Sequence, residues 1–213
     1  SCANGWVTGC TVTDVDCDGI WWRGDNTKVL NNTISDVGKG SGVTGDCIQF
    51  SADYANVQII GNRCDHSSVE EKQCIILSGA AADTGVVVAN NWCKMAPYTG
   101  LDTKTIFIEA DAFVCRGNYV ENGKYGIWSE NTDGSYIYGN ILVNVGVRGI
   151  PISYTGAEVS YIYNNTIVGG CSDGGIFQSS AAASGATQFK NNLVVNCTGK
   201  GMYVDGANTI LDS

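Results

Sequence analysis

Short runs of β-branched and aromatic residues recur along the whole chain, and a polar dipeptide follows them. Such runs include residues 57–60, 86–88, 136–138 and 161–163. The dipeptides are Asn31-Asn32, Gly61-Asn62, Asn90-Asn91, Gly117-Asn118, Gly139-Asn140, Asn164-Asn165 and Asn191-Asn192, with Gly9-Cys10 as a degenerate first copy. Counted from Cys10, their second residues are 22, 30, 29, 27, 22, 25 and 27 positions apart. A period of about 20–50 residues indicates a repeat architecture.

Three apolar columns recur with this dipeptide, two at a fixed offset from it and the third 9–16 residues after its second member. One lies three residues before its second member: Val7, Val29, Ile59, Val88, Cys115, Ile137, Ile162 and Phe189. A second lies two residues after it: Val12, Ile34, Cys64, Cys93, Val120, Leu142, Ile167 and Val194. A third follows later: Ile20, Ile48, Ile75, Ile106, Ile127, Ile150, Ile176 and Met202. The columns predict eight coils, each with about three short strands.

This pattern resembles the right-handed parallel β-helix repeat of the pectin-lyase-like superfamily, and the likeness covers nearly all of residues 1–213. It implies an all-β solenoid in a single domain, either by itself or as a segment of a longer chain. Parallel strands lie about 4.8 Å apart, so equivalent residues of successive coils stack on one another. An inward Asn in each coil can then bond to the Asn above and below, which predicts an asparagine ladder.

Stacking also suggests partners for six of the ten cysteines. Cys47 with Cys74, Cys64 with Cys93, and Cys171 with Cys197 occupy equivalent places in adjacent coils. The spacing of adjacent strands lies within the Cα separation that a disulfide tolerates. We therefore predict three disulfides between coils, with a reduced and buried thiol ladder as the alternative. The sequence suggests no partners for the remaining four: Cys2, Cys10, Cys17 and Cys115.

Composition narrows the functional classes. The net charge of −9 argues against nucleic-acid binding, which needs a basic surface. No apolar run is long enough to span a bilayer, so we expect no membrane insertion. The cysteine content favours an oxidising location: extracellular, at the cell surface or in a virion. We also expect packing against further coils or a homo-oligomer, since open solenoid ends expose strand edges.

The outward positions beside the third column predict a candidate functional face. Its central coils carry seven candidate residues: Lys104, Phe107, Glu109, Tyr125, Trp128, Glu130 and Arg148. Trp128, Phe107 and Trp21 are candidate rings for stacking on sugars. Glu109 and Glu130 should be vertical neighbours, and such a pair raises the pKa of one carboxyl or binds a cation. Catalytic roles are therefore predicted for Glu109, Glu130, Arg148, Lys104 and Tyr125.

Two reaction types suit this face. A carboxyl pair near 5 Å is typical of a retaining glycosidase. A carboxylate pair holding Ca²⁺, with Arg or Lys as the base, suits a polysaccharide lyase. No cofactor is certain, and Ca²⁺ on Glu109 and Glu130 is the one metal hypothesis. The other interpretation is a solvated face whose aromatic rings are covered.

A secondary candidate is His66, the only histidine, next to Asp65 in a polar turn. A carboxylate beside an imidazole can orient a general base. A lone histidine in a loop is more often a turn residue. Glu70, Glu71 and Lys72 follow in the same excursion.

Motifs of known carbohydrate-active β-helices are incomplete here. Asn131-Thr132-Asp133 resembles the first polygalacturonase motif, but the later motifs are missing. Tyr125-Gly126-Ile127 resembles the start of the alginate epimerase motif, whose Asp-Pro-His is replaced by Trp128-Ser129-Glu130. The resemblance therefore implies the fold and no family within it.

Two hypotheses follow for the function. The first is an extracellular carbohydrate-active or carbohydrate-binding β-helix of polysaccharide lyase or glycoside hydrolase type, with a polysaccharide as partner. The second is a non-catalytic shaft or adhesin segment, as in a phage tail spike, a virion fibre or a cell-surface protein.

Overall fold

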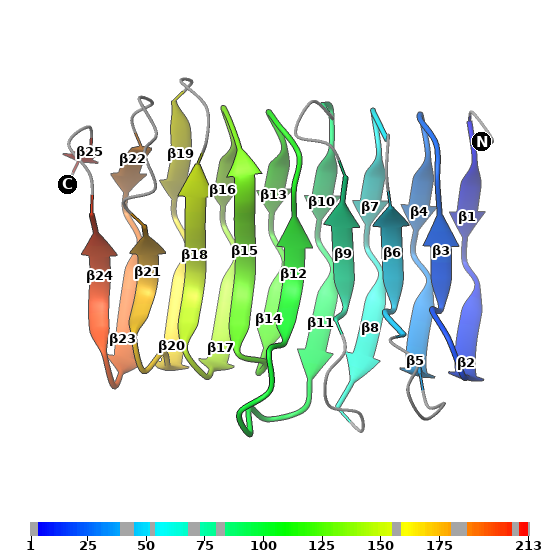
Figure 1. The fold of residues 1–213 in the computed structure, drawn as a ribbon, viewed down its shortest axis with the longest axis horizontal. Coiled ribbons are helices and arrows are strands. Elements are labelled where there is room, and N and C mark those ends of the chain that lie inside the picture. The colour runs from blue at the N-terminus through cyan, green and yellow to red at the C-terminus, as the bar shows by residue number, and fades with distance from the viewer. Residues whose placement is uncertain are drawn as a thin grey trace.

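The computed structural model describes residues 4–38, 45–51, 54–67, 73–79, 84–154, 159–179, 187–205 and 209–212. In these residues the chain forms strands, turns and connections, and no helix long and apolar enough to cross a membrane is found among them. Figure 1 shows the strands standing side by side along one axis, with the two termini at opposite ends of a rod.

The strands belong to three parallel sheets. Sheet A contains β1 (Trp6–Thr8), β4 (Lys28–Leu30), β7 (Gln58–Ile60), β10 (Val87–Ala89), β13 (Val114–Arg116), β16 (Tyr136–Tyr138), β19 (Ser160–Tyr163), β22 (Thr187–Lys190) and β25 (Thr209–Asp212). Sheet B contains β2 (Thr11–Val15), β5 (Thr33–Val37), β8 (Arg63–His66), β11 (Trp92–Met95), β14 (Tyr119–Glu121), β17 (Ile141–Val145), β20 (Thr166–Gly170) and β23 (Leu193–Cys197). Sheet C contains β3 (Ile20–Trp22), β6 (Ile48–Ser51), β9 (Ile75–Ser78), β12 (Lys104–Ile108), β15 (Tyr125–Thr132), β18 (Arg148–Tyr154), β21 (Gly174–Gln178) and β24 (Lys200–Val204).

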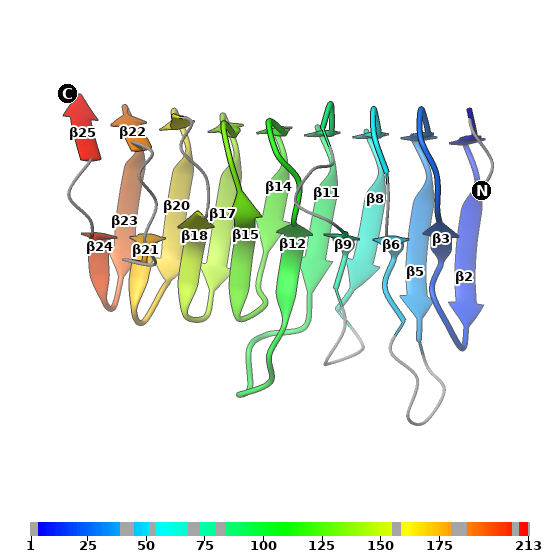
Figure 2. The ribbon, with the colours of Figure 1, turned by 45° about the horizontal axis from the view of Figure 1, so that its top comes forward.

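Each pass of the chain adds one strand to each sheet, and every strand pairs with the strand one coil away. Figure 2 shows this winding from a second direction. The predicted solenoid with stacked apolar columns is confirmed. Val29 pairs with Ile59 in sheet A, and Ile34 pairs with Cys64 in sheet B. These columns form one continuous interior core, because parallel strands in register stack their inward side chains.

The predicted asparagine ladder is also confirmed. The side-chain amide of each ladder residue before Asn192 donates to the side-chain oxygen of the next, at 2.9–3.0 Å. The ladder consists of Asn32, Asn62, Asn91, Asn118, Asn140, Asn165 and Asn192. Each of these amides also donates to a backbone carbonyl of a neighbouring coil, as Asn118 does to Val88.

The two positions of the dipeptide have separate roles. The first residue has a positive φ, 54° at Asn90 and 63° at Gly139, and turns the chain from sheet A into sheet B. The second residue points inward and forms the ladder. Asn and Gly share the first position because these residues tolerate left-handed backbone most readily.

The predicted disulfides are absent from the structure. All nine described cysteines are free thiols, and Cys2 lies outside the described residues. Cys64 and Cys93 are register partners, as predicted, and both are buried. Cys197 pairs in register with Gly170 rather than with Cys171, because the chain turns through two left-handed glycines, Gly169 and Gly170. The alternative of buried thiols therefore describes the interior of this rod.

Candidate functional site

The outer face of sheet C holds an interlocked group of side chains, here called the Trp128 cluster: Lys104, Phe107, Tyr125 and Trp128. Phe107 on β12 and Trp128 on β15 are register partners, and their ring centroids lie 6.1 Å apart, edge to face. The Tyr125 ring meets Trp128 edge to face at 4.5 Å. The Lys104 ammonium lies 4.3 Å from the Phe107 centroid and 4.5 Å from the Trp128 centroid.

Burial separates the roles of these rings. Phe107 is 5 % exposed and Tyr125 is 9 % exposed, whereas Trp128 is half-buried. The prediction that Phe107 offers an open stacking ring is therefore wrong, because Lys104 and Trp128 cover it. Phe107 and Tyr125 instead fix the plane of Trp128, since edge-to-face aromatic pairs favour a defined orientation.

Glu109 and Glu130 lie near this cluster. The register that pairs Ile108 with Ser129 brings Glu109 beside Glu130 at the point where β12 ends. Both side chains are half-buried. The backbone of Glu109 is held on two sides: its amide donates to Leu77, and its carbonyl accepts a hydrogen bond of 2.8 Å from the Tyr54 hydroxyl. Glu130 pairs in register with Ser153.

The calcium hypothesis gains no support from this pair. Among the residues that the structure describes, no three His, Cys, Asp or Glu side chains are arranged to hold a metal ion. Two carboxylates supply fewer than the six to eight oxygen ligands that Ca²⁺ prefers. We therefore derive no chemistry through a metal at Glu109 and Glu130.

Arg148 lies one coil further along and is engaged by its neighbours. Its Nε and Nη2 atoms lie 2.8 and 2.7 Å from one carboxylate oxygen of Asp173. Its guanidinium carbon sits 3.6 Å above the Phe177 ring, which in turn stacks on Tyr203 at 4.8 Å. Arg148 thus forms a fixed cationic contact on the face. As a predicted catalytic base it would first have to leave Asp173.

The turn beside the cluster adds groups that the repeat pattern did not reveal. Lys124 Nζ lies 2.9 Å from Asp102, and that contact raises the pKa of the Lys124 ammonium. The Lys124 amide donates to the Thr103 hydroxyl at 2.8 Å. Asp102 and Thr103 belong to the 96–103 connection between β11 and β12, which projects from the edge of the rod in Figure 1. The connection from sheet B to sheet C differs in length from coil to coil, so the repeat pattern did not reveal these residues.

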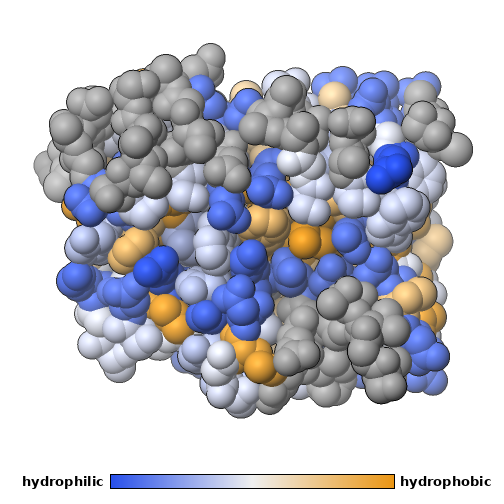
Figure 3. All heavy atoms as spheres, in the orientation of Figure 1, coloured by the Kyte–Doolittle hydropathy of each residue, from blue (hydrophilic) through white to orange (hydrophobic). Residues whose placement is uncertain are grey.

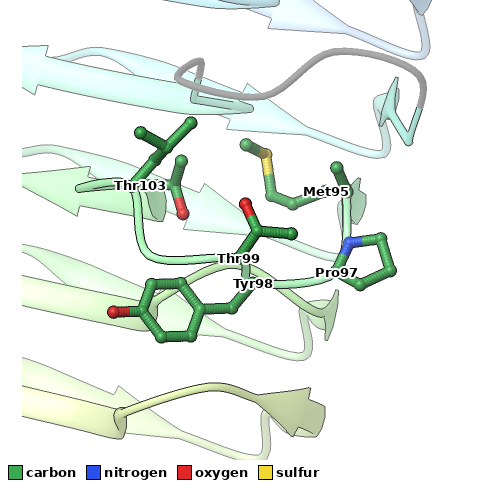
Figure 4. Close-up of a pocket in the computed structure, with 7 residues that line it drawn as sticks. Met95, Pro97, Tyr98, Thr99 and Thr103 are labelled. Atoms are coloured by element: carbon green, nitrogen blue, oxygen red, sulfur yellow. The ribbon is translucent and has the colours of Figure 1, made fainter.

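This connection also lines a small, partly open pocket of about 10 Å³. Figure 4 shows Met95, Pro97, Tyr98, Thr99 and Thr103 around it. The pocket is below the range of about 300–1,000 Å³ that is usual for small-molecule sites. It is a feature of the turn rather than a binding cavity for a sugar chain.

Two other predicted groups are not brought to the cluster. Trp21 is 53 % exposed on β3, three strands away from β12 in sheet C, where Arg23 is its cationic neighbour. His66 is fully buried, while Asp65 points to the opposite side of β8 and contacts Arg63 and Ser67. The prediction that Asp65 orients His66 as a base is not supported. Glu70, Glu71 and Lys72 lie outside the described residues.

The comparison with protein families matches this architecture. The family model described as the right-handed beta helix region matches residues 1–167. The chain belongs to this right-handed β-helix family. A search of curated proteins found no match, and neither did a search of solved structures. The β-helix family model covers the Trp128 cluster, but it assigns no activity to those residues.

A second aromatic group on this β-helix was missed by the sequence reasoning. On the outer face of sheet A, Tyr136 stacks on Tyr161 at 4.9 Å, and Tyr138 stacks on Tyr163 at 4.8 Å. Burial and the neighbouring phenols Tyr138 and Tyr136 raise the pKa of Tyr163. The Tyr-Ile-Tyr alternation at 136–138 and 161–163 was the available signal, because alternate residues of a strand share a face.

Proposed function

We propose that this β-helix binds a polysaccharide along the outer face of sheet C, outside the cell or at its surface. The observation that carries the proposal is the partly exposed Trp128 ring, held in place by two buried rings and by the Lys104 ammonium. Figure 3 views this side of the rod, where hydrophilic residues alternate with apolar ones. A rigid ring among polar groups is the usual way to hold a ligand that has both apolar and hydroxyl surfaces.

The polar groups around Trp128 follow the rod axis. Lys104, Tyr125 and Arg148 are successive register partners, so they repeat about every 4.8 Å. Asp173 and Glu130 add acceptors for sugar hydroxyls on the same face. An extended glycan that crosses β12, β15, β18 and β21 would meet a ring first and then several donors and acceptors. This arrangement supports binding without turnover, as in an adhesin, as the primary function.

Catalysis is the second candidate, and one observation favours it. The register brings Glu109 beside Glu130 next to Trp128, and a carboxyl pair about 5 Å apart suits a retaining glycosidase. If the chain is a glycosidase, one of Glu109 and Glu130 is the general acid and the other is the nucleophile. Arg148 and Lys104 position the substrate.

The binding proposal predicts a specific effect of Trp128→Ala. Loss of the ring should weaken retention on the polysaccharide that wild type binds best by about tenfold, the usual effect of an anchoring aromatic. The measurement is affinity electrophoresis of the full chain through gels that contain members of a polysaccharide panel. Trp6→Ala is the matched control, because Trp6 is an exposed tryptophan with a lysine, Lys28, 4.9 Å from its centroid on sheet A.

Equal retention of the Trp128 and Trp6 variants would contradict the placement of the site. Glu130→Gln separates the two candidates in the same panel. If the chain only binds, this variant keeps most of its retention and wild type releases no reducing ends or unsaturated products. If the chain cleaves the glycan, wild type releases products and Glu130→Gln does not.

A further inference from the structure

Four thiols meet inside the rod between sheets B and C, here called the thiol ring: Cys47, Cys64, Cys74 and Cys93. Cys64 on β8 and Cys93 on β11 are register partners. Cys47 and Cys74 immediately precede β6 and β9. They also lie on adjacent coils, as the hydrogen bond from the Ile48 amide to the Cys74 carbonyl shows. All four side chains are fully buried.

Each thiol of the ring contacts two others. The interactions run in a closed circuit, from Cys47 to Cys64, Cys64 to Cys93, Cys93 to Cys74, and Cys74 back to Cys47. Cys74 Sγ also lies 3.5 Å from the Met95 sulfur. Cys115 is the contrast inside the same rod, since it is equally buried but contacts Asn118 and none of these thiols.

The environment makes one sulfur the natural nucleophile. Interaction with the Cys47 thiol, and then with the Cys93 thiol, holds the pKa of Cys64 below the ordinary value. Burial raises the pKa of Cys47, Cys74 and Cys93. Thiolates attack disulfides, whereas thiols do not, so exchange that follows local opening of the folded coils begins at Cys64.

We propose that the thiol ring is an oxidisable site, at which a small disulfide such as oxidised glutathione converts pairs of ring cysteines into cystines that clamp adjacent coils. The geometry suits Cys64 with Cys93 and Cys47 with Cys74, because adjacent parallel strands lie about 4.8 Å apart, within the Cα range of a disulfide. We assign the ring to redox chemistry because its cysteines stand in pairs on adjacent coils.

The reaction is ordinary thiol–disulfide exchange. The Cys64 thiolate attacks one sulfur of oxidised glutathione, the glutathione S–S bond breaks, and one glutathione leaves and takes up a proton. Cys93, deprotonated in turn, attacks the Cys64 sulfur of the mixed disulfide, and the second glutathione leaves and is protonated. Two protein thiols lose two electrons and two protons, and one oxidised glutathione becomes two reduced molecules. Because the ring is buried, the exchange requires folding from the denatured state or local opening of the coils.

The test compares two samples of the full chain. One is refolded with a reducing agent, and the other with a mixture of reduced and oxidised glutathione. Both are then mapped as unreduced peptides by mass spectrometry. We expect cystine peptides that link ring cysteines in the oxidised sample, and an apparent melting temperature roughly 5–10 °C above that of the reduced sample. Ring cysteines that remain thiols, or cystines formed only outside the ring, would overturn the proposal.

Variants make the test specific. A Cys64→Ala, Cys93→Ala double variant should lose at least half of the shift in melting temperature, whereas Cys115→Ala should retain it. If the double variant does not fold, the peptide map of the wild-type chain decides alone. An oxidised wild type with ring cystines but an unchanged melting temperature would also overturn the clamp.

Discussion

At the scale of single residues, the ladder asparagines carry an unusual number of buried hydrogen bonds. The Asn118 side chain donates to Asn140 and to the Val88 carbonyl, and its oxygen accepts from the side chain and the backbone amide of Asn91. No other residue of similar size combines an acceptor and a two-hydrogen donor, and aspartate, which has the same shape, has no donor when ionised. The position therefore requires asparagine.

We expect Asn118→Ala to lower the free energy of unfolding by about 3 kcal/mol, because it leaves several buried partners without a hydrogen bond. Asn192→Ala, at the partly exposed end of the ladder, should cost about half as much, since water can replace the lost amide. Urea unfolding followed by circular dichroism measures both. Equal losses at the two positions would contradict this account of the ladder.

The positions of inward-facing residues could be predicted from the sequence better than the exposure of outward-facing residues. A buried column such as Ile20 to Met202 repeats in every coil, so its period reveals it. Phe107 was predicted to be an open ring, because the alternation of residues along a strand shows only which face of the sheet a side chain lies on. What covers the ring is the Lys104 side chain, whose conformation depends on Trp128 one coil away.

At the scale of elements, the turn from sheet A into sheet B is set by one left-handed residue in each coil. Glycine and asparagine share this place, with φ of 63° at Gly139 and 54° at Asn164 in the next coil. The nearest atom to a Cβ added at Gly139 is the Gly117 nitrogen, 4.0 Å away. Space therefore does not limit this position, and backbone conformation does.

Substitutions at Gly139 should separate these two effects. Gly139→Asn should change the free energy of unfolding by less than about 0.5 kcal/mol, because asparagine tolerates this φ. Gly139→Val should cost about 1–2 kcal/mol, because a β-branched side chain clashes with its own left-handed backbone. Thermal and urea unfolding of the two variants provide the comparison. A valine as well tolerated as asparagine would refute the turn assignment.

Strands that recur in every coil could be predicted from the sequence, whereas connections that differ in length between coils could not. The strands of sheets A and B lie at regular offsets from the dipeptide, and each strand of sheet C is marked by an Ile or Met 9–16 residues after the dipeptide's second member. The 96–103 connection has no such mark, so the contacts of Asp102 and Thr103 with Lys124 were found only in the structure. The Arg148–Asp173 pair was hidden for the same reason, since Asp173 lies in a turn between the columns.

At the scale of the whole molecule, each coil contacts mainly its two neighbours, as in other solenoids. Removal of residues 141–165 would therefore join Asn140 to Thr166 and remove one complete coil with β17, β18 and β19. The ladder offset of 25 residues between Asn140 and Asn165 makes this a deletion in phase. We expect a shorter rod that still unfolds cooperatively and retains its β-sheet circular dichroism.

Removal of residues 141–152 is the control, because it deletes about half a coil and shifts every later column out of register. This variant should lose cooperative unfolding or become insoluble, since a shifted register exposes apolar side chains. Circular dichroism and urea unfolding of both deletions test the account. If the half-coil deletion is as stable as the full-coil deletion, stacking in register is not what holds the rod together.

The direction of the backbone hydrogen bonds gives the rod a mechanical property. These bonds join one coil to the next, so they lie along the long axis and carry tension applied between the two ends. Under a pull the end coils detach one at a time, because only one row of bonds per sheet holds each of them. Each detached coil frees the 22–30 residues between ladder positions, or about 80–110 Å of extended chain. The rod therefore yields in steps and dissipates work before the chain is fully extended.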